Sequence, residues 1–201
     1  MPGIFYLWLL WGVWVLGTFF MERNKRERFF LSFISLLLLI TFPYVVEFKD
    51  YQIQVPAIIL AIICIIQISK YSFLEKIHLL IRYITVSFGY SGFLFMALYD
   101  PVWLIVEKKY MTIIFLVIII HLLGFKDLKK MMVCLIISVT QGDIIYSVGL
   151  ERLGIPTVIG APDTLDTLAL SSLVILMVKG FAAAAYYLES KQQFGKKQKQ
   201  I

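Results

Sequence analysis

The chain has 201 residues, of which 60% are hydrophobic and 15% aromatic, and it carries a formal net charge of +6. Soluble domains are usually about 45–50% apolar, so this composition, with a mean hydropathy of +0.85, excludes a soluble globular domain and indicates an integral membrane protein in the lipid bilayer. The basic residues fall in short turns between long apolar runs, without the basic stripe of a nucleic-acid-binding surface. Nucleic acid is therefore excluded as a partner.

Seven apolar stretches have about the 17–25 residues that a membrane-spanning helix needs. They cover residues 4–21, 29–46, 54–69, 78–98, 104–123, 131–149 and 167–188. The connecting loops are short, so consecutive helices are expected to pack as antiparallel neighbours. We predict an all-α fold, a polytopic membrane bundle of seven transmembrane helices, with one domain over residues 1–188 and a basic cytoplasmic tail at 189–201.

The first span, within "MPGIFYLWLLWGVWVLGTFF", has no Lys or Arg before its apolar core and no A-x-A pattern after it. A signal peptide carries both features, so the segment is predicted to be retained. Its positive charges follow the span, in "ERNKRER", which predicts an N-terminus outside the cell.

The fifth span, 104–123, is the least regular, because it contains Glu107, Lys108 and Lys109 near its start. We interpret "DPVWLIVEKK" as an interfacial lead-in that begins at Asp100 and Pro101. Residues 110–123 contain no Gly or Pro and are predicted to cross the membrane.

The last outer loop, "ERLGIPTVIGAPDT", has two Gly and two Pro and neither a helical nor a strand period. It ends at Asp163, and Asp166 follows three residues later. Acidic residues stabilise the first turn of a helix, so this pair is predicted to cap the last helix.

The distribution of Lys and Arg supports seven crossings with the N-terminus outside and the C-terminus in the cytoplasm. With that topology the inner segments 22–28, 70–77, 124–130 and 189–201 hold thirteen Lys and Arg, and the outer segments hold four. Two more, Arg82 and Lys179, lie within spans. Cytoplasmic loops of membrane proteins are enriched in positive charge, and removing one span would place alternate loops on the wrong side.

The segment "ISVTQGDIIYS", residues 137–147, places Asp143 about twelve residues, or roughly 18 Å, from the cytoplasmic end of its helix. Lys179 lies about nine residues, or roughly 13–14 Å, from the cytoplasmic end of the last span. An unpaired charge at such depth costs about 2.5–3.5 kcal/mol on insertion scales. We therefore hypothesise an Asp143–Lys179 ion pair inside the bundle, with Gln141 and Thr140 completing its hydrogen bonds or lining a small polar cavity.

Two further polar residues, Arg82 and His121, lie near the inner ends of their spans. Long or amphipathic side chains at this depth can reach the membrane interface. They are either scattered interface anchors, which is the favoured interpretation, or parts of an inner polar vestibule.

The aromatic first span "FYLWLLWGVWVLGTFF", the basic turn after it and the "TQGD" segment resemble the YphA-like proteins. These are small multi-pass membrane proteins of Bacillus and related Gram-positive bacteria. The resemblance runs over most of the chain and implies a bacterial plasma-membrane location. It supplies no mechanism and no site residues.

The sequence contains none of the motifs G-x-S-x-G, H-E-x-x-H or Walker A, so we predict a non-enzymatic protein without a cofactor. The favoured function is a membrane scaffold or assembly factor with Asp143–Lys179 as an internal clamp. The alternative is a small-solute or ion transporter or sensor that uses the polar residues of the last two spans. A remote alternative is a rhodopsin-like retinal protein, because "VKGF" places a lysine in the seventh span, although 54–69 lacks an Asp counterion.

Overall fold

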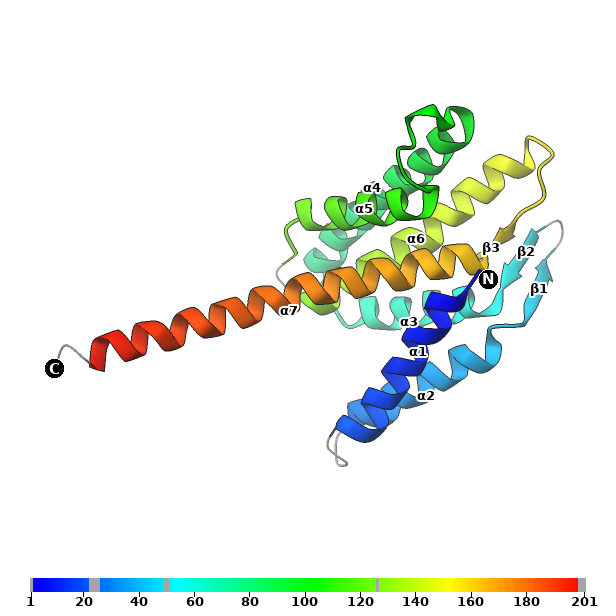
Figure 1. Ribbon diagram of the computed structural model, residues 1–201. Helices are drawn as coiled ribbons and strands as arrows, with labels where there is room; N and C mark the ends of the chain where they lie inside the picture. The colour runs from blue at the N-terminus through cyan, green and yellow to red at the C-terminus, as the bar shows by residue number, and fades with distance from the viewer. Residues whose placement is uncertain (1, 22–25, 49–50, 126, 199–201) are drawn as a thin grey trace.

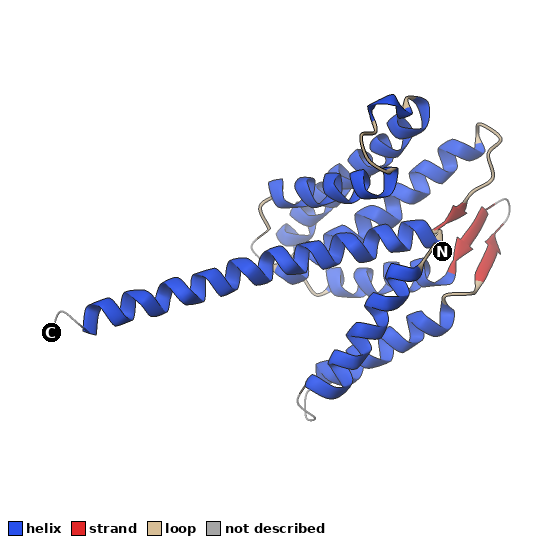
Figure 2. Ribbon diagram, viewed as in Figure 1, coloured by secondary structure: helices blue, strands red, loops and turns tan. Residues whose placement is uncertain are grey.

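A computed structural model describes residues 2–21, 26–48, 51–125 and 127–198. Within these ranges helices predominate, and three short strands form one small sheet (Figures 1 and 2). In chain order the elements are α1 (Ile4–Val15), the π-helical turn η1 (Leu16–Phe20), α2 (Arg26–Thr41), β1 (Val45–Phe48), β2 (Tyr51–Gln54), α3 (Val55–Ser69), α4 (Phe73–Tyr99), the 3₁₀ turn η2 (Pro101–Trp103), α5 (Lys108–Leu122), α6 (Leu128–Glu151), β3 (Val158–Ile159) and α7 (Pro162–Gln198).

Helices α3, α4 and α6 cover three of the predicted apolar stretches, and α4 and α6 extend beyond them at both ends. Of these three helices, α4 and α6 are long enough to cross a membrane. Helix α3 begins within one residue of the expected start, whereas α4 begins five residues early. The reason is a capping box, in which Ser72 and Glu75 satisfy each other's backbone N–H groups. Asp127 likewise starts α6 by accepting a hydrogen bond from the Lys129 N–H at 2.9 Å.

The second span ends earlier than predicted. The prediction of a purely helical fold is also wrong, because the structure contains a small sheet. Helix α2 ends at Thr41, and residues 45–48 form β1, which pairs antiparallel with β2. Strand β2 in turn pairs parallel with β3. Pro43 disfavours helix just before this segment, and the β-branched and aromatic residues after it favour strand. Counting apolar residues alone could not detect this change.

The predicted fifth span is interrupted at its start. The Asp100 carboxylate accepts a hydrogen bond from the Val102 N–H at 3.2 Å, so Asp100 and Pro101 begin the short turn η2 rather than a spanning helix. Helix α5 starts only at Lys108. Its 15 residues extend about 22 Å, less than the roughly 30 Å of a bilayer core.

Three helices in the described part of the chain are long and apolar enough to cross a membrane: α4, α6 and residues Pro162–Tyr187 of α7. Shorter apolar helical segments cover Ile4–Phe20 and α3. Helix α7 begins before the predicted 167 and continues to Gln198, so the backbone of the predicted tail is helical at 189–198. Figure 1 shows this end of α7 projecting beyond the other helices. Residues 22–25 of the predicted basic turn and 199–201 lie outside the described ranges.

Helix α6 is the central element, because it packs most extensively against α4 and also contacts α3, α5 and α7. Gly142 allows the close approach to α4. A Cβ at this position would lie 2.6 Å from the Tyr90 ring and 2.9 Å from the Ser87 carbonyl oxygen. Small residues permit such backbone contact between membrane helices.

Candidate functional site

Asp143 is only 4% exposed and joins α6 to the turn between β3 and α7. Its carboxylate accepts hydrogen bonds from the Gly160 N–H at 2.6 Å and the Thr164 hydroxyl at 3.1 Å. Gly160 has a φ of +72°, a conformation that favours glycine. The turn therefore presents its N–H to the carboxylate, and Asp143 is satisfied without a cation in direct contact.

The predicted Asp143–Lys179 ion pair is wrong. The Lys179 ammonium instead donates a hydrogen bond to the Phe125 carbonyl oxygen at 3.2 Å, in the loop that precedes α6. Lys179 follows Thr164, the partner of Asp143, by fifteen residues of continuous helix, or about 22 Å. The prediction failed because it measured the depth of Lys179 from residue 188, whereas α7 continues past the bundle and places Lys179 near the bundle's inner end.

The four residues of "TQGD" lie on different faces of α6, because a helix turns by about 100° per residue. Thr140 donates to the Ile136 carbonyl oxygen at 2.8 Å within its own helix and lines an apolar groove beside α3. Gln141 is half-buried, and no hydrogen bond of its side chain occurs within the described residues. Neither residue supports Asp143 as predicted.

The weaker candidates lie around Phe125 at the other end of the bundle. The Arg82 guanidinium carbon is 4.6 Å from the centroid of the Phe125 ring, whose carbonyl group Lys179 contacts. His121 contacts the Val117 carbonyl oxygen through Nδ1 at 3.0 Å, and its buried Nε2 finds no partner among the described residues. Arg82 and Lys179 therefore meet at one loop, whereas His121 bonds within its own helix and faces an open groove.

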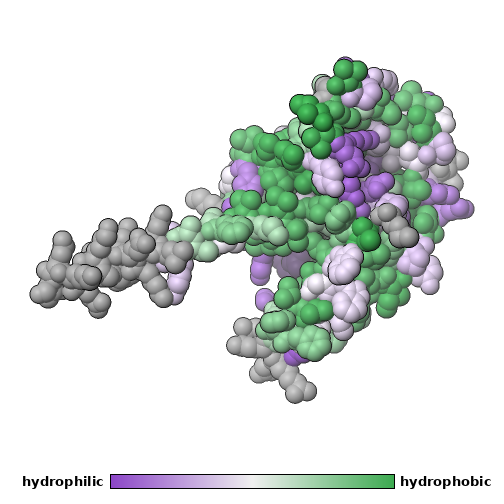
Figure 3. Space-filling view, viewed as in Figure 1, coloured by the Kyte–Doolittle hydropathy of each residue, from purple (hydrophilic) through white to green (hydrophobic). Residues whose placement is uncertain are grey.

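The cavity that contains Asp143 has a volume of about 420 Å³. It lies among the last turns of α4 and α6, the first turns of α5 and α7, and the loop around β3. Figure 3 shows hydrophilic residues gathered in a hollow of an otherwise largely apolar face. The lining residues are Tyr90, Leu94, Glu107, Lys108, Lys109, Thr112, Asp143, Tyr146, Ser147, Thr157, Val158, Ala161, Asp163, Thr164 and Thr167.

Lys108 is the cation of this cavity that lacks an ionic partner in the described part of the chain. The residue is half-buried, and its ammonium lies 5.3 Å from the centroid of the Tyr146 ring, within the range of a cation–π contact. Asp143 and Asp163 act on it electrostatically. None of the described carboxylates approaches it within 4 Å.

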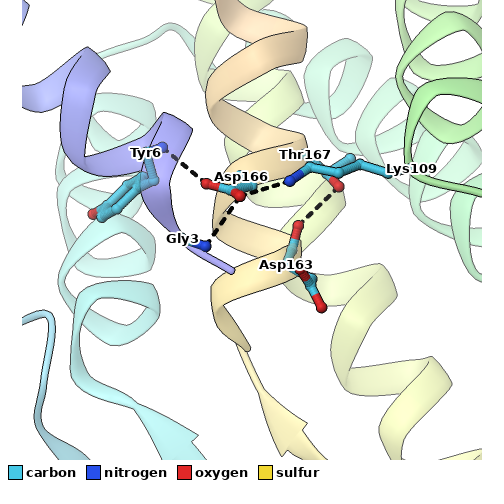
Figure 4. Close-up of polar contacts among 6 residues, drawn as sticks. All are labelled: Gly3, Tyr6, Lys109, Asp163, Asp166 and Thr167. Atoms are coloured by element: carbon cyan, nitrogen blue, oxygen red, sulfur yellow. Dashed lines mark hydrogen bonds and ion pairs between the residues drawn. The ribbon is translucent and has the colours of Figure 1, made fainter. Parts of the chain in front are cut away.

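Lys109, by contrast, is fully engaged at one side of the cavity. Its ammonium forms an ion pair of 2.6 Å with Asp166, whose side chain is completely buried. Asp166 also accepts hydrogen bonds from the Gly3 N–H at 3.0 Å and the Tyr6 N–H at 2.9 Å (Figure 4). It therefore caps the start of α1, not of its own helix as predicted, and joins α1, α5 and α7.

Asp163 lies in the first turn of α7, as predicted, and borders the same cavity. Its backbone carbonyl accepts the Thr167 hydroxyl at 2.9 Å (Figure 4). The sequence reasoning missed the roles of Lys108, Lys109 and Tyr146 in the site. The available signal was that antiparallel neighbours bring the start of α5 and the start of α7 to the same end of the bundle.

The profile of the family described as "YphA-like integral membrane protein" matches residues 2–201. The chain belongs to this family. The assignment confirms the YphA-like resemblance found in the sequence and establishes an integral membrane protein. Among YphA-like relatives, the Bacillus subtilis (strain 168) protein "Uncharacterized protein YphA" is 22% identical over 193 residues, which cover 96% of this chain and 95% of the relative. No solved structure matches the chain.

Proposed function

We propose that the chain is a multi-pass plasma-membrane protein that binds a small polar solute in the cavity of Asp143, as a sensor or as the outward-facing state of a carrier. The observation that supports this is a cavity of about 420 Å³ bordered by Lys108, Asp143 and Asp163. Ionisable groups are costly within a membrane and usually mark functional sites there. Cavities of roughly 300–1,000 Å³ are typical of small-molecule sites.

The proposed topology places this cavity at the outer surface. The cavity lies where α4 and α6 end and where α5 and α7 begin. With seven crossings and an outer N-terminus, which the Lys and Arg distribution supports, those ends face outward. In this topology the short helices α2, α3 and α5 cross by local thinning of the bilayer, which costs only fractions of a kcal/mol per Å of mismatch.

One turn further into the bundle the packing is apolar and tight. Val86, Leu116 and Val139 lie four residues inward of the cavity residues Tyr90, Thr112 and Asp143, and each is at most 1% exposed. The solute is therefore expected to enter from outside and to stop at this layer. A sensor needs only this access from outside. A carrier would also have to let the solute pass the apolar layer, which requires α4 to separate from α6.

A scaffold or assembly factor is the second candidate. The observation that favours it is the buried Lys109–Asp166 pair, which joins the first turns of three helices. Buried charges can specify a single arrangement of helices without taking part in chemistry. In this case the cavity would have no ligand.

Site-directed labelling separates the two candidates. Thr157 borders the cavity and is half-buried, whereas Ser69 is exposed at the opposite end; the native Cys64 and Cys134 are buried. A membrane-impermeant thiol reagent should label Thr157→Cys in intact bacteria and Ser69→Cys only after permeabilisation. The small-molecule fraction of growth medium should slow labelling of Thr157→Cys if a solute binds. Unchanged labelling rates favour the scaffold, and the reverse labelling pattern contradicts the topology.

A further inference from the structure

The cavity presents opposite charges that are not in direct contact with one another. Lys108 borders it from the start of α5, and Asp163 borders it from the start of α7. Within the described residues, neither side chain forms an ion pair or a hydrogen bond to another side chain. Two charges of opposite sign that share a cavity without contact leave a gap that a ligand can bridge.

Two other charged residues of the cavity, Lys109 and Asp143, already have partners, which limits the groups available to a ligand. Lys109 is paired with Asp166 at 2.6 Å. Asp143 accepts two hydrogen bonds, from Gly160 and Thr164, although a carboxylate has about four acceptor sites. The cavity therefore offers one free cation at Lys108 and free acceptor capacity at Asp163 and Asp143, and Glu107 adds a further carboxylate at its border.

A ligand with a single charge fits this arrangement poorly. An anion held by Lys108 would face the carboxylates of Asp143 and Asp163, whereas a cation held by those carboxylates would face Lys108. Asp143 is buried, Lys108 half-buried and Asp163 exposed, and like charges brought close together at such a partly buried site repel each other. A molecule with a negative charge at one end and a positive charge at the other can place the first near Lys108 and the second near Asp143 and Asp163.

We propose that the cavity binds a small zwitterion with the chemistry of an amino acid. Its carboxylate pairs with Lys108, and its ammonium group lies on the side of Asp143 and Asp163. Tyr146, whose ring already contacts Lys108 at 5.3 Å, forms an aromatic wall beside the ligand. This inference rests on the proposed solute-binding function and specifies the class of solute.

The test uses the full-length protein purified into lipid nanodiscs. Thermal unfolding and calorimetry are measured with each standard amino acid, with glycine betaine, and with two matched probes for every amino acid. One probe lacks the amino group and the other lacks the carboxylate. At least one zwitterion should raise the unfolding temperature, and its two singly charged analogues should bind at least ten-fold more weakly.

Variants locate the binding site. Lys108→Met and Asp163→Asn should each weaken zwitterion binding at least ten-fold, while Lys108→Arg should retain most of it. Lys179→Met is the matched control, because it removes a lysine that contacts Phe125 far from the cavity, and it should bind as the parent does. If Lys108→Met is poorly folded, Lys108→Arg and Asp163→Asn still provide the comparison.

Each other outcome is informative. The proposal of a zwitterionic ligand would be overturned by equal binding to parent and to Lys108→Met, or by a preference for a singly charged analogue. Solute binding itself would then still stand. If none of the probes binds and medium also fails to slow labelling of Thr157→Cys, the zwitterion and the proposed function fail together.

Discussion

At the scale of single residues, Asp166 shows how this protein stabilises a charge that water cannot reach. Its carboxylate is completely buried and serves three donors, the Lys109 ammonium and the N–H groups of Gly3 and Tyr6. The two N–H groups belong to the first turn of α1, where a negative charge is also favoured by the helix dipole. The two backbone hydrogen bonds therefore join α7 to the start of α1, and the bond from Lys109 joins α7 to α5.

Replacing Asp166 by Asn should destabilise the protein by about 3–5 kcal/mol, because Lys109 would become an unpaired charge in a mostly buried place. Thermal unfolding in detergent, followed by tryptophan fluorescence, measures the loss. The double variant Asp166→Asn with Lys109→Met should recover part of it, since no charge then remains unpaired. A single Asp166→Asn variant as stable as the parent would contradict the assignment.

Ser171→Ala provides the matched control on the same helix. Ser171 is fully buried, and its hydroxyl has no hydrogen-bond partner among the described residues. Removing an unsatisfied buried polar group is neutral or stabilising. The unfolding temperature should therefore stay the same or rise, in contrast to the loss at Asp166.

The separation of Asp143 from Lys179 makes a second prediction at this scale. The two residues have different partners, and Thr164, which bonds Asp143, precedes Lys179 by about 22 Å of helix, so they should contribute independently to stability. In a cycle of Asp143→Asn, Lys179→Met and the double variant, the coupling energy should be less than about 0.5 kcal/mol. If one substitution rescued the other, that result would support the Asp143–Lys179 ion pair that the structure contradicts.

At the scale of elements, α6 uses its faces for different tasks. Gly142 and Gly149 face α4, where an added Cβ would lie 2.6 Å from the Tyr90 ring and 2.3 Å from the Phe95 ring. Asp143, Tyr146 and Ser147 face the cavity, and Thr140, Ile144 and Val148 face the groove beside α3. A helix with this arrangement has little freedom to rotate about its axis.

Gly142→Ala tests the contact between α4 and α6. The new methyl group would meet the Ser87 carbonyl oxygen at 2.9 Å, and backbone cannot move aside as a flexible side chain can. Overpacking of this kind typically costs about 1–3 kcal/mol, which unfolding in detergent would reveal. The control is Gly180→Ala on α7, where a Cβ meets nothing within 4 Å; it should be neutral or slightly stabilising. Equal effects at the two glycines would argue against a tight α4–α6 contact.

At the scale of the whole molecule, α7 unites the two ends of the structure. Its first turns provide Thr164 to Asp143 and Asp166 to α1, and Lys179 reaches the loop before α6. Beyond this point the described side chains at 181–187 are exposed. Figure 1 shows the same feature, since the C-terminal part of α7 extends away from the other helices.

Truncation after Tyr187 should therefore leave the folded bundle intact. The described side chains just before the cut, at 181–187, are all exposed, so the core contacts of the described side chains end before the truncation point. The truncated and full-length proteins should accumulate in the membrane equally and unfold at the same temperature within about 2 °C, less than a 1 kcal/mol change produces in a domain of 150–250 residues. A lower unfolding temperature would show that the projecting helix packs against another surface.

The helices of the core were predictable, because long apolar runs bounded by caps allow few alternatives. The ends of α3, α4 and α6 agree with the apolar pattern within a few residues, and Asp163 was recognised in the first turn of the last helix. The sheet was missed because its strands are only two to four residues long, too short to show the alternating pattern that marks a strand in a sequence. Asp143, which the sequence singled out, borders the cavity, but its predicted partner Lys179 contacts Phe125 instead.

Composition and the order of apolar runs determined by themselves that this chain lies in a membrane as a set of helices, because a segment without a polar face can be solvated only by lipid or by other helices. Only the tertiary structure decided which charges meet. Pairing between helices depends on how far each helix is shifted along its neighbours, and each residue of shift moves a side chain by about 1.5 Å. Helix α7 continues ten residues past the predicted end at 188, so Lys179 lies near Phe125, and Lys108 rather than Lys179 shares the cavity of Asp143.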